Sequence, residues 1–286
     1  MIRETPLSLA NGLFAMATQP ETPTGLPVVV LLNAGLVHRV GPFRLYVPLA
    51  RTLAAAGFPV VRFDQPGVGD APNKDDPDEA AVMSRIFDEL AGILYTNDFI
   101  VGGLCAAADL AWGVAHKDKR VRGLLLLDPV ALGGFWFQLG KIRLFMRRKA
   151  STWLSMIQRS FNRKKPANTD FRDWPKPEEV RGEFEKFIAD GIAVLAIYTG
   201  GAAPYFTHAR QIDTTFGAAA RDPRAQFEYW PECDHTFMLS ADQARLIVTI
   251  KQWSVKYFVP KKAVTSATHP ASAAGPLPTP AVRAQR

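Results

Sequence analysis

The stretch Phe99-Ile-Val-Gly-Gly-Leu-Cys-Ala-Ala-Ala-Asp109 joins an apolar run to a helical pattern through a cysteine flanked by small residues. The apolar run predicts a buried strand over 99–101, and the spacing after the cysteine predicts a helix. Gly103, Cys105 and Ala107 occupy the three positions that define a nucleophile elbow, the sharp strand-to-helix turn written glycine-x-nucleophile-x-small. The turn crowds the backbone, so the residues two before and two after the nucleophile must be small. We therefore predict that the thiol stands at the end of a strand, where serine is usual.

Short apolar runs alternate with amphipathic stretches along most of the chain. Runs rich in β-branched residues predict buried strands, and the stretches between them have the spacing of helices. Strands are expected at 27–32, 58–63, 99–101, 121–127, 192–198 and 225–230. Helices are expected near 43–56, 78–95, 106–114, 207–219 and 241–258, and residues 6–18 are candidates for antiparallel edge strands. The alternation predicts an α/β fold with a mostly parallel sheet that helices cover on both faces.

Two regions interrupt this alternation. Residues of about 130–188 lie between two predicted strands and are too many for a plain crossover helix. Because their apolar residues fall near helical spacing, we interpret them as a helical cap inserted into one domain of residues 1–260. Residues 261–286 are rich in proline, alanine, serine and threonine, which predicts a disordered tail outside the fold.

The positive charge of the chain is concentrated in the predicted cap. The formal net charge is +7, no acidic residue occurs between Asp128 and Asp170, and nine lysines and arginines lie from Lys141 to Lys165. Such a block favours an anionic partner, either a phosphate-bearing substrate, a carrier protein or a lipid surface. Peripheral contact with an anionic surface through the basic cap is therefore one expectation, and a solvated helical face is the alternative. No nucleic-acid partner is expected.

The composition is that of an ordinary globular protein. The chain has 286 residues, of which 48% are hydrophobic and 21% charged, enough to bury a large core. No apolar run is long enough to span a bilayer, and the N-terminus lacks the apolar core of a signal peptide, so a cytoplasmic location is predicted.

The cysteine count and the glycine-rich turn exclude several kinds of site. The two cysteines, Cys105 and Cys233, form no zinc-like cluster, and the turn at 64–70 lacks the features of a phosphate-binding loop. We therefore expect no metal and no cofactor. A reversible disulfide between the two cysteines is a hypothesis if the fold brings them together, and a buried loop thiol at position 233 is the alternative.

Three segments, Asn33-Ala-Gly-Leu36, Gly103-Leu-Cys-Ala-Ala107 and Asp234-His-Thr-Phe237, resemble the α/β-hydrolase fold and occur in its chain order. Two further segments, Asn33–Pro42 and Arg62–Asp64, make the chain similar to a bacterial group of small hydrolases of the serine aminopeptidase and monoacylglycerol-lipase type. Some relatives associated with exosortase systems also carry cysteine at the elbow, and dienelactone hydrolase is a further relative with a cysteine nucleophile. The resemblance covers most of the chain and is weakest in the cap.

The resemblance implies roles for several residues. Cys105 would be the nucleophile, favoured as a thiolate at a helix N-terminus, and His235, after the last predicted strand, would be the general base. Backbone N–H groups of Ala106 and Leu36 would form the oxyanion hole. The alternatives are a small buried cysteine and a structural histidine. His38 is the rival histidine, either lining the pocket or structural.

The acid that would orient the base is missing from its usual place. The loop after the penultimate predicted strand, Thr199–Tyr205, contains no carboxylate. Asp128, at the end of the preceding strand, is slightly favoured as a replacement, and Asp213 and Asp234 are the alternatives. A cysteine–histidine pair can also work without an acid, because a thiol is far more acidic than a serine hydroxyl.

The implied function is hydrolysis of an ester or thioester through an acyl intermediate on Cys105. The expected substrate is a small acyl compound, and the apolar, basic cap makes a carrier-linked or CoA-linked acyl group one candidate. An acyltransferase or cyclase that uses the same pocket is an alternative. A catalytically inactive binding protein with the α/β-hydrolase fold is another.

Overall fold

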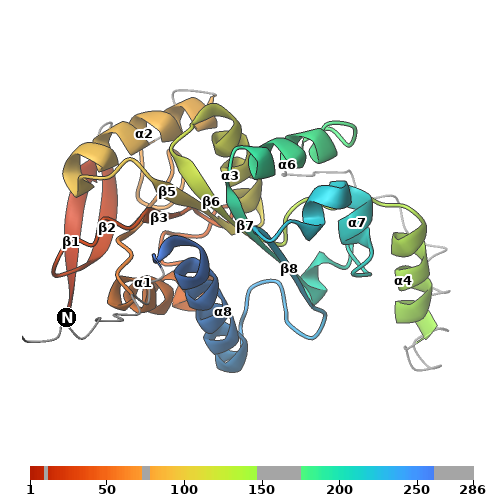
Figure 1. Ribbon diagram of the computed structural model, residues 1–286. Coiled ribbons are helices and arrows are strands. Elements are labelled where there is room, and N and C mark those ends of the chain that lie inside the picture. Colours follow the sequence, from red (N-terminus) through yellow and green to blue (C-terminus); the bar gives the residue numbers. More distant parts are fainter. Residues whose placement is uncertain (10–11, 73–77, 147–174, 261–286) are drawn as a thin grey trace, which may run out of the picture.

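The computed structural model describes residues 1–9, 12–72, 78–146 and 175–260. Within them, eight strands form one sheet in the order β1-β2-β4-β3-β5-β6-β7-β8 (Figure 1). The strands are β1 (Ile2–Leu9), β2 (Leu13–Pro20), β3 (Val28–Leu31), β4 (Val60–Phe63), β5 (Phe99–Leu104), β6 (Val121–Leu127), β7 (Ala193–Thr199) and β8 (Ala225–Trp230). Strands β3 to β8 are parallel, whereas β1 and β2 form an antiparallel pair that joins the edge of β4. The predicted mostly parallel α/β sheet is confirmed.

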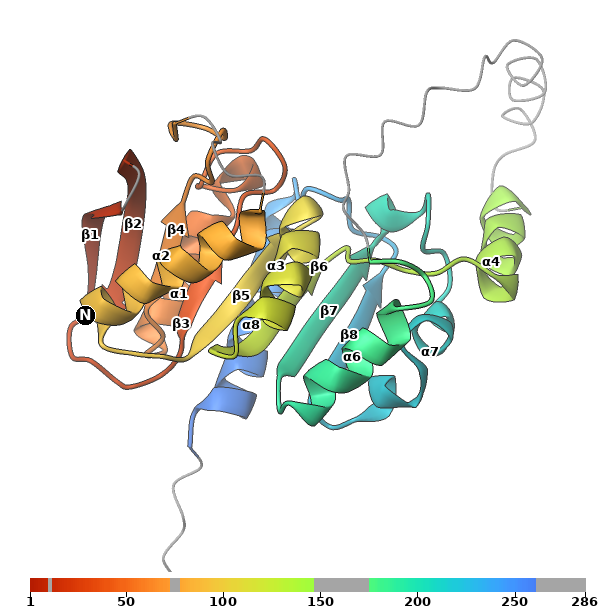
Figure 2. The same ribbon diagram turned by 90° about the horizontal axis from the view of Figure 1, so that it is seen from above.

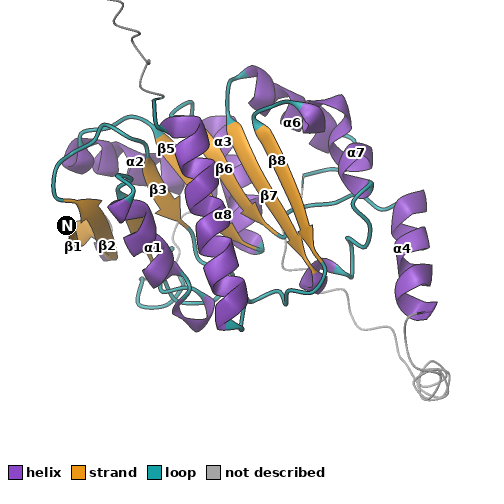
Figure 3. Ribbon diagram, turned by 60° about the horizontal axis from the view of Figure 1, so that its bottom comes forward, coloured by secondary structure: helices purple, strands orange, loops and turns teal. Residues whose placement is uncertain are grey.

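Helices cover the sheet on both faces. They are α1 (Tyr46–Ala55), α2 (Glu79–Leu94), α3 (Ala106–Lys117), α4 (Phe135–Met146), α6 (Val180–Ala189), α7 (Gln211–Phe216) and α8 (Ser240–Phe258), with short 3₁₀ turns at Pro42–Arg44, Gly200–Ala202 and Gly217–Arg221. Figure 2 shows α2, α3 and α6 on one face, and Figure 3 shows α1 and α8 on the other.

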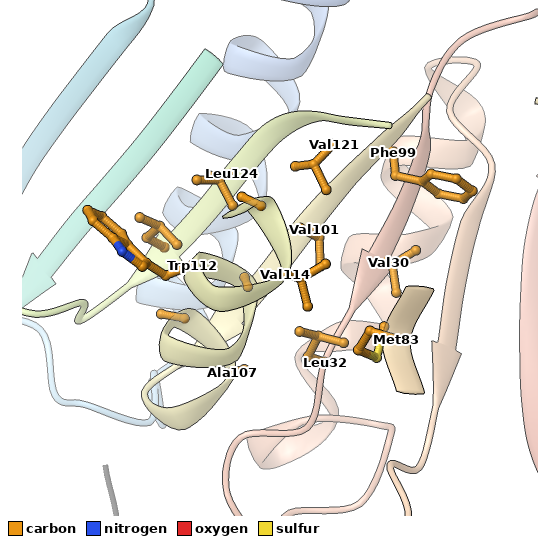
Figure 4. Packing of buried hydrophobic residues seen from close by; sticks show 14 of the residues in the cluster. Val30, Leu32, Met83, Phe99, Val101, Ala107, Trp112, Val114, Val121 and Leu124 are labelled. Atoms are coloured by element: carbon orange, nitrogen blue, oxygen red, sulfur yellow. The ribbon is translucent and has the colours of Figure 1, made fainter. Parts of the chain in front are cut away.

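The core is divided by the sheet into two apolar clusters. Val30 and Val101 point to the face covered by α2 and α3, and Figure 4 shows them beside Met83 of α2. The neighbouring residues Val29 and Ile100 point to the opposite face and pack with α1 and α8. Burial on both faces is the reason these strands are continuous apolar runs rather than alternating ones.

Strand β5 is longer than predicted, because the glycines expected to end it lie inside it. It runs to Leu104 and passes through Gly102 and Gly103. A Cβ atom on Gly102 would lie 1.9 Å from the carbonyl oxygen of Leu125 in β6. The glycine therefore permits close approach of two central strands and carries the chain straight into the elbow.

The region predicted as a cap contains two different kinds of helix. Helix α6 begins within 130–188 and ends one residue beyond it, yet its Val180, Phe184 and Phe187 are buried in the core over the sheet. Helix α4 instead stands at one end of the molecule in all three ribbon views (Figures 1–3). Residues 147–174 of the predicted cap and the predicted tail at 261–286 lie outside the described residues. Among the described helices, none combines the length and apolarity needed to cross a membrane.

Candidate active site

Cys105 lies in a strained turn between β5 and α3, with φ 62° and ψ −118°. A Cβ atom on Gly103 would lie 2.7 Å from the Cβ of Ala107 and 2.9 Å from the carbonyl oxygen of Leu32. The backbone N–H of Cys105 donates to the carbonyl of Leu127 at 2.9 Å, which ties the turn to β6. The crowding explains why this turn needs small residues on both sides of the cysteine, and the strain is of the kind found at functional sites.

Two backbone segments beside this turn hold the predicted oxyanion donors. Ala106 is the first residue of α3, and the first amides of a helix have no acceptor within it. Leu36 lies in the loop after β3, the strand next to β5, and that loop is folded by a hydrogen bond from Val37 N–H to the Ala34 carbonyl at 3.1 Å. The two donors therefore follow neighbouring parallel strands at the same edge of the sheet.

His235 and Asp128 form a direct pair. His235 follows β8 and Asp128 follows β6, and the Nδ1 atom of the histidine lies 2.6 Å from the carboxylate Oδ2. Asp128 is 0% exposed, whereas the imidazole retains 34% of its exposure. A buried carboxylate on one ring nitrogen fixes the ring's orientation and leaves the other nitrogen for chemistry.

Further hydrogen bonds hold the buried carboxylate of Asp128 in place. The backbone N–H of Thr199 donates to Oδ1 at 2.6 Å, and the hydroxyl of Thr199 donates to Oδ2 at 2.7 Å. The hydroxyl of Tyr205 donates to the backbone carbonyl of Asp128 at 3.0 Å. Because a buried polar group is costly unless hydrogen bonds satisfy it, these donors stabilise the carboxyl group of Asp128 in this place.

The pKa of His235 is raised to about 9 by its hydrogen bond to Asp128 and, next in size, by a hydrogen bond to Cys105. The imidazole therefore contacts the carboxylate on one side and the thiol on the other. A histidine with this pKa is protonated at neutral pH, which favours a negative thiolate beside it. Cys105, His235 and Asp128 thus follow one another in space as thiol, imidazole and carboxylate, the order of groups that an activated nucleophile requires.

The loop after β7 is the usual source of the acid in this fold, but here it contains no carboxylate. It contacts His235 through Gly201. A Cβ atom on Gly201 would lie 2.3 Å from the Cβ of His235. Sequence reasoning noted the missing carboxylate but missed this close approach and the part played by Thr199. The register of parallel strands was the available signal, because Leu127 pairs with Ile197 and so brings the ends of β6 and β7 together.

The other candidate acids lie in separate local interactions. Asp213 pairs with Arg221 at 3.3 Å on the surface. Asp234 accepts hydrogen bonds from the N–H and hydroxyl of Thr236 and from the N–H of Met238 within its own turn. The structure therefore places Asp128, and neither of these alternatives, on the His235 ring.

Neither Cys233 nor Cys105 forms a disulfide bond. The side chain of Cys233 is buried, and burial raises the pKa of this thiol to about 12. The structure thus places Cys233 as a buried loop thiol, with no disulfide to Cys105.

His38 belongs to a second polar cluster, which fastens the loop after β3 to the loop after β4. Its Nε2 atom lies 3.1 Å from Asp70, and Arg39 Nη1 lies 2.6 Å from the carboxylate of Asp64 and 2.8 Å from that of Asp70. Asp64, 1% exposed, also accepts from the side chain of Asn33. The loop after β3, which holds the predicted donor Leu36, is therefore anchored through the buried side chain of Asp64, a role that sequence reasoning did not identify.

The same cluster brings together groups that can bind metal. Ligand atoms of His38, Asp64 and Asp70 lie within 4.8 Å of one another. The guanidinium of Arg39 already lies against all three, at 2.6 Å from the histidine Nε2. A cationic side chain thus occupies the place that a metal would need, and these residues do not fit a metal centre.

A cavity of about 60 Å³ lies between the loop after β4, α2 and α3. Its lining residues are Gln65, Pro66, Val68, Glu79, Val82, Met83 and Leu110. Neither Cys105 nor His235 lines this cavity, so it is separate from the candidate site.

Comparison with known proteins gives a family match and a set of structural neighbours. Residues 29–248 match the alpha/beta hydrolase family, and no curated protein matches. The thioesterase domain from the curacin biosynthetic pathway is 16% identical with a TM-score of 0.52, and the alignment covers 87% of this chain and 99% of that domain. The esterase domain from a Rhodothermus marinus protein is 15% identical with a TM-score of 0.54, covering 90% of this chain and 99% of that one. An esterase from Pyrococcus furiosus is 10% identical with a TM-score of 0.55, covering 90% and 91%.

At these identities the solved structures establish likeness of fold alone. The family match extends over most of the sheet and over the loops after β5, β6 and β8, which hold the candidate site. It begins in β3, includes Cys105, Asp128 and His235, and ends within α8. The chain belongs to the alpha/beta hydrolase family.

Proposed function

We propose that the protein hydrolyses an ester or thioester through an acyl intermediate on Cys105. The observation that carries the proposal is the arrangement of the thiol, His235 and the buried Asp128, linked by hydrogen bonds at the carboxyl edge of the sheet. This arrangement also favours an enzyme over a catalytically inactive binding protein. The loop that usually supplies the acid has none, but Asp128 from another loop contacts His235.

In the acylation half, the Cys105 thiolate attacks the carbonyl carbon of the substrate. The sulfur–carbon bond forms as the carbonyl electron pair moves to oxygen, and backbone N–H groups of Ala106 and Leu36 stabilise that oxyanion. When the intermediate collapses, the bond to the alkoxide or thiolate leaving group breaks. The imidazolium of His235 donates its proton to that group, which leaves an acyl-cysteine and a neutral histidine.

In the deacylation half, neutral His235 takes a proton from a water molecule as the water oxygen attacks the acyl-cysteine. Collapse of the second tetrahedral intermediate releases a carboxylic acid and restores the thiolate beside the imidazolium. Asp128 stabilises the imidazolium at each stage and does not itself exchange protons. An amine or alcohol in place of water would make the same intermediate the donor in an acyl transfer.

The expected substrate is a small acyl compound. The proposed chemistry acts on its carbonyl carbon and accepts either an alkoxide or a thiolate as the leaving group. The names of the structural neighbours, a thioesterase domain and esterases, support esters and thioesters as the first compounds to test. A thioester linked to CoA or to a carrier is the candidate with the better leaving group.

The test is intact-mass detection of an acyl adduct after mixing with an activated ester or an acyl-CoA thioester. We expect one acyl group on the wild-type chain and none on Cys105→Ala, with loss of hydrolysis in that variant. Cys233→Ala is the matched control, because it removes the other cysteine and should keep both adduct and turnover. An unmodified wild-type chain that still hydrolyses the substrate, or an active Cys105→Ala, would overturn the covalent mechanism.

A further inference from the structure

Helix α4 is fixed to the body of the protein through one face. Gly140 is buried, and a Cβ atom there would lie 2.3 Å from the hydroxyl of Thr207. That hydroxyl donates to the backbone carbonyl of Phe137 at 2.9 Å. The ring of Trp136 stacks on His208 with centroids 5.1 Å apart, and the Arg210 guanidinium lies 4.4 Å from the Trp136 ring centroid. These contacts set which face of α4 points toward the protein.

A second face of α4 is apolar and exposed. Phe135, Leu139, Ile142 and Met146 are separated by steps of four, three and four residues, which places them in one stripe along a helix. Their exposed fractions are 71%, 39%, 55% and 65%. An apolar stripe of large side chains that no part of the described protein covers is typical of an interaction site.

The charge around this stripe is positive. Lys141 and Arg143 lie within α4, which contains no acidic residue. In the sequence, seven further lysines and arginines follow up to Lys165, and no acidic residue appears before Asp170. The partner must therefore offer negative charge together with an apolar phase. Anionic bilayers offer both, and a helix with an apolar face and basic flanks suits their interface.

We propose that α4 binds the surface of an anionic membrane, with the stripe of Phe135, Leu139, Ile142 and Met146 inserted at the level of the lipid headgroups. A membrane fits better than an acidic protein, because the stripe lies exposed on a helix at one end of the molecule and a fluid interface needs no complementary groove. Tyr205, next to the loop that anchors α4, donates to the backbone of Asp128. Docking would thus hold the carboxyl edge of the sheet beside the membrane.

The experiment is flotation of the full chain with vesicles of phosphatidylcholine alone or mixed with phosphatidylglycerol. Wild type should float with the anionic vesicles and remain behind with the neutral ones, and added salt should weaken the binding. The double variant F135E/I142E should lose at least about 10-fold of the bound fraction, because each acid sets a charge against lipid phosphates and removes apolar area. Val248→Glu, at a side chain 51% exposed on α8, is the matched control and should bind like wild type.

Several results would overturn the proposal. One is failure of the wild-type protein to float with anionic vesicles, and another is equal flotation with both kinds of vesicle. A third is a loss of bound fraction in Val248→Glu as large as the loss in F135E/I142E. A concentration-dependent dimer that F135E/I142E abolishes, without vesicle binding, would assign the stripe to a second copy. A lowered melting temperature of F135E/I142E, again without vesicle binding, would show that the chain itself covers the stripe. Hydrolysis of a water-soluble ester should be equal in all three proteins, so this test is independent of the proposed catalysis.

Discussion

Asp128 is a buried acid whose hydrogen bond to the imidazole is the largest cause of the raised pKa of His235. Its carboxylate accepts hydrogen bonds from Thr199 and from the imidazole, and its backbone carbonyl accepts from Tyr205. An imidazole held this way is both oriented and charged, because the protonated ring is the better donor to a carboxylate. At the scale of single residues, the proposed chemistry therefore requires Asp128 as well as the thiol.

Replacing Asp128 with asparagine should remove both effects. We expect the His235 pKa to fall from about 9 toward the ordinary value near 6.5. The ratio kcat/KM should fall by about 10²- to 10⁴-fold, as when the acid of a serine triad is neutralised. Titration of the histidine by NMR and hydrolysis rates on one thioester would measure the two changes.

Asp213→Asn is the matched control for Asp128→Asn, since the same substitution there affects only a surface pair with Arg221. It should change neither the histidine titration nor the rate. An Asp128→Asn protein with the wild-type His235 pKa and undiminished turnover would contradict the role assigned to Asp128.

The raised pKa of His235 also predicts how Cys105 responds to pH. The imidazolium persists up to a pH of about 9, so the positive charge beside the thiol is present across the neutral range. Because an opposite charge favours the ionised form, alkylation of Cys105 by iodoacetamide should already be rapid near pH 6. In His235→Gln, the midpoint of the alkylation rate should rise toward about 8.5, the value of an ordinary cysteine.

Mass spectrometry of the alkylated peptides measures both cysteines in one sample. Cys233 should stay unmodified throughout, because burial raises the pKa of that thiol to about 12. Identical alkylation midpoints in wild type and His235→Gln would show that no ion pair forms at Cys105.

At the scale of elements, the loops after β7 and β8 work as a pair. Gly200 and Gly201 allow the loop after β7 to lie against the loop that carries the base. A Cβ on Gly200 would lie 2.4 Å from the carbonyl oxygen of Pro231, and one on Gly201 would lie 2.3 Å from the Cβ of His235. The glycines therefore permit the close packing that fixes the position of His235.

Gly201→Ala should displace His235 and lower kcat/KM by about 10²-fold, since a shift of about 1 Å in a catalytic group is enough for such a loss. Gly201 is exposed, so the melting temperature should change little. Gly113→Ala is the matched control, because a Cβ there meets nothing within 4 Å and helix α3 favours alanine. Wild-type activity in Gly201→Ala would show that the loop tolerates the added methyl group and does not position the base.

For the molecule as a whole, the parallel sheet gathers groups that are distant in the sequence. Cys105, Asp128 and His235 follow β5, β6 and β8, and the parallel direction of these strands brings their carboxyl ends to one edge. The aspartate and histidine are 107 residues apart in the chain. The basic helix α4 lies at one end of the same molecule (Figure 1), where it can bind a surface without covering the sheet.

The fold class and the elbow could be predicted from the sequence because both arise from local spacing. The apolar runs coincide closely with the central strands, and the spacing of Gly103, Cys105 and Ala107 is sufficient to predict the turn. The extent of β5 was predicted less well, because its glycines serve close packing against β6 rather than a turn.

The sequence does not determine which acid contacts His235. It slightly favours Asp128 and leaves Asp213 and Asp234 as alternatives. Only the tertiary structure decided among them, because the answer depends on which strand ends lie together across the sheet. Local pattern therefore determined the strands and the turn that presents the thiol. Long-range packing selected Asp128, through the pairing of β6 with β7 and the folding of the β8 loop over both.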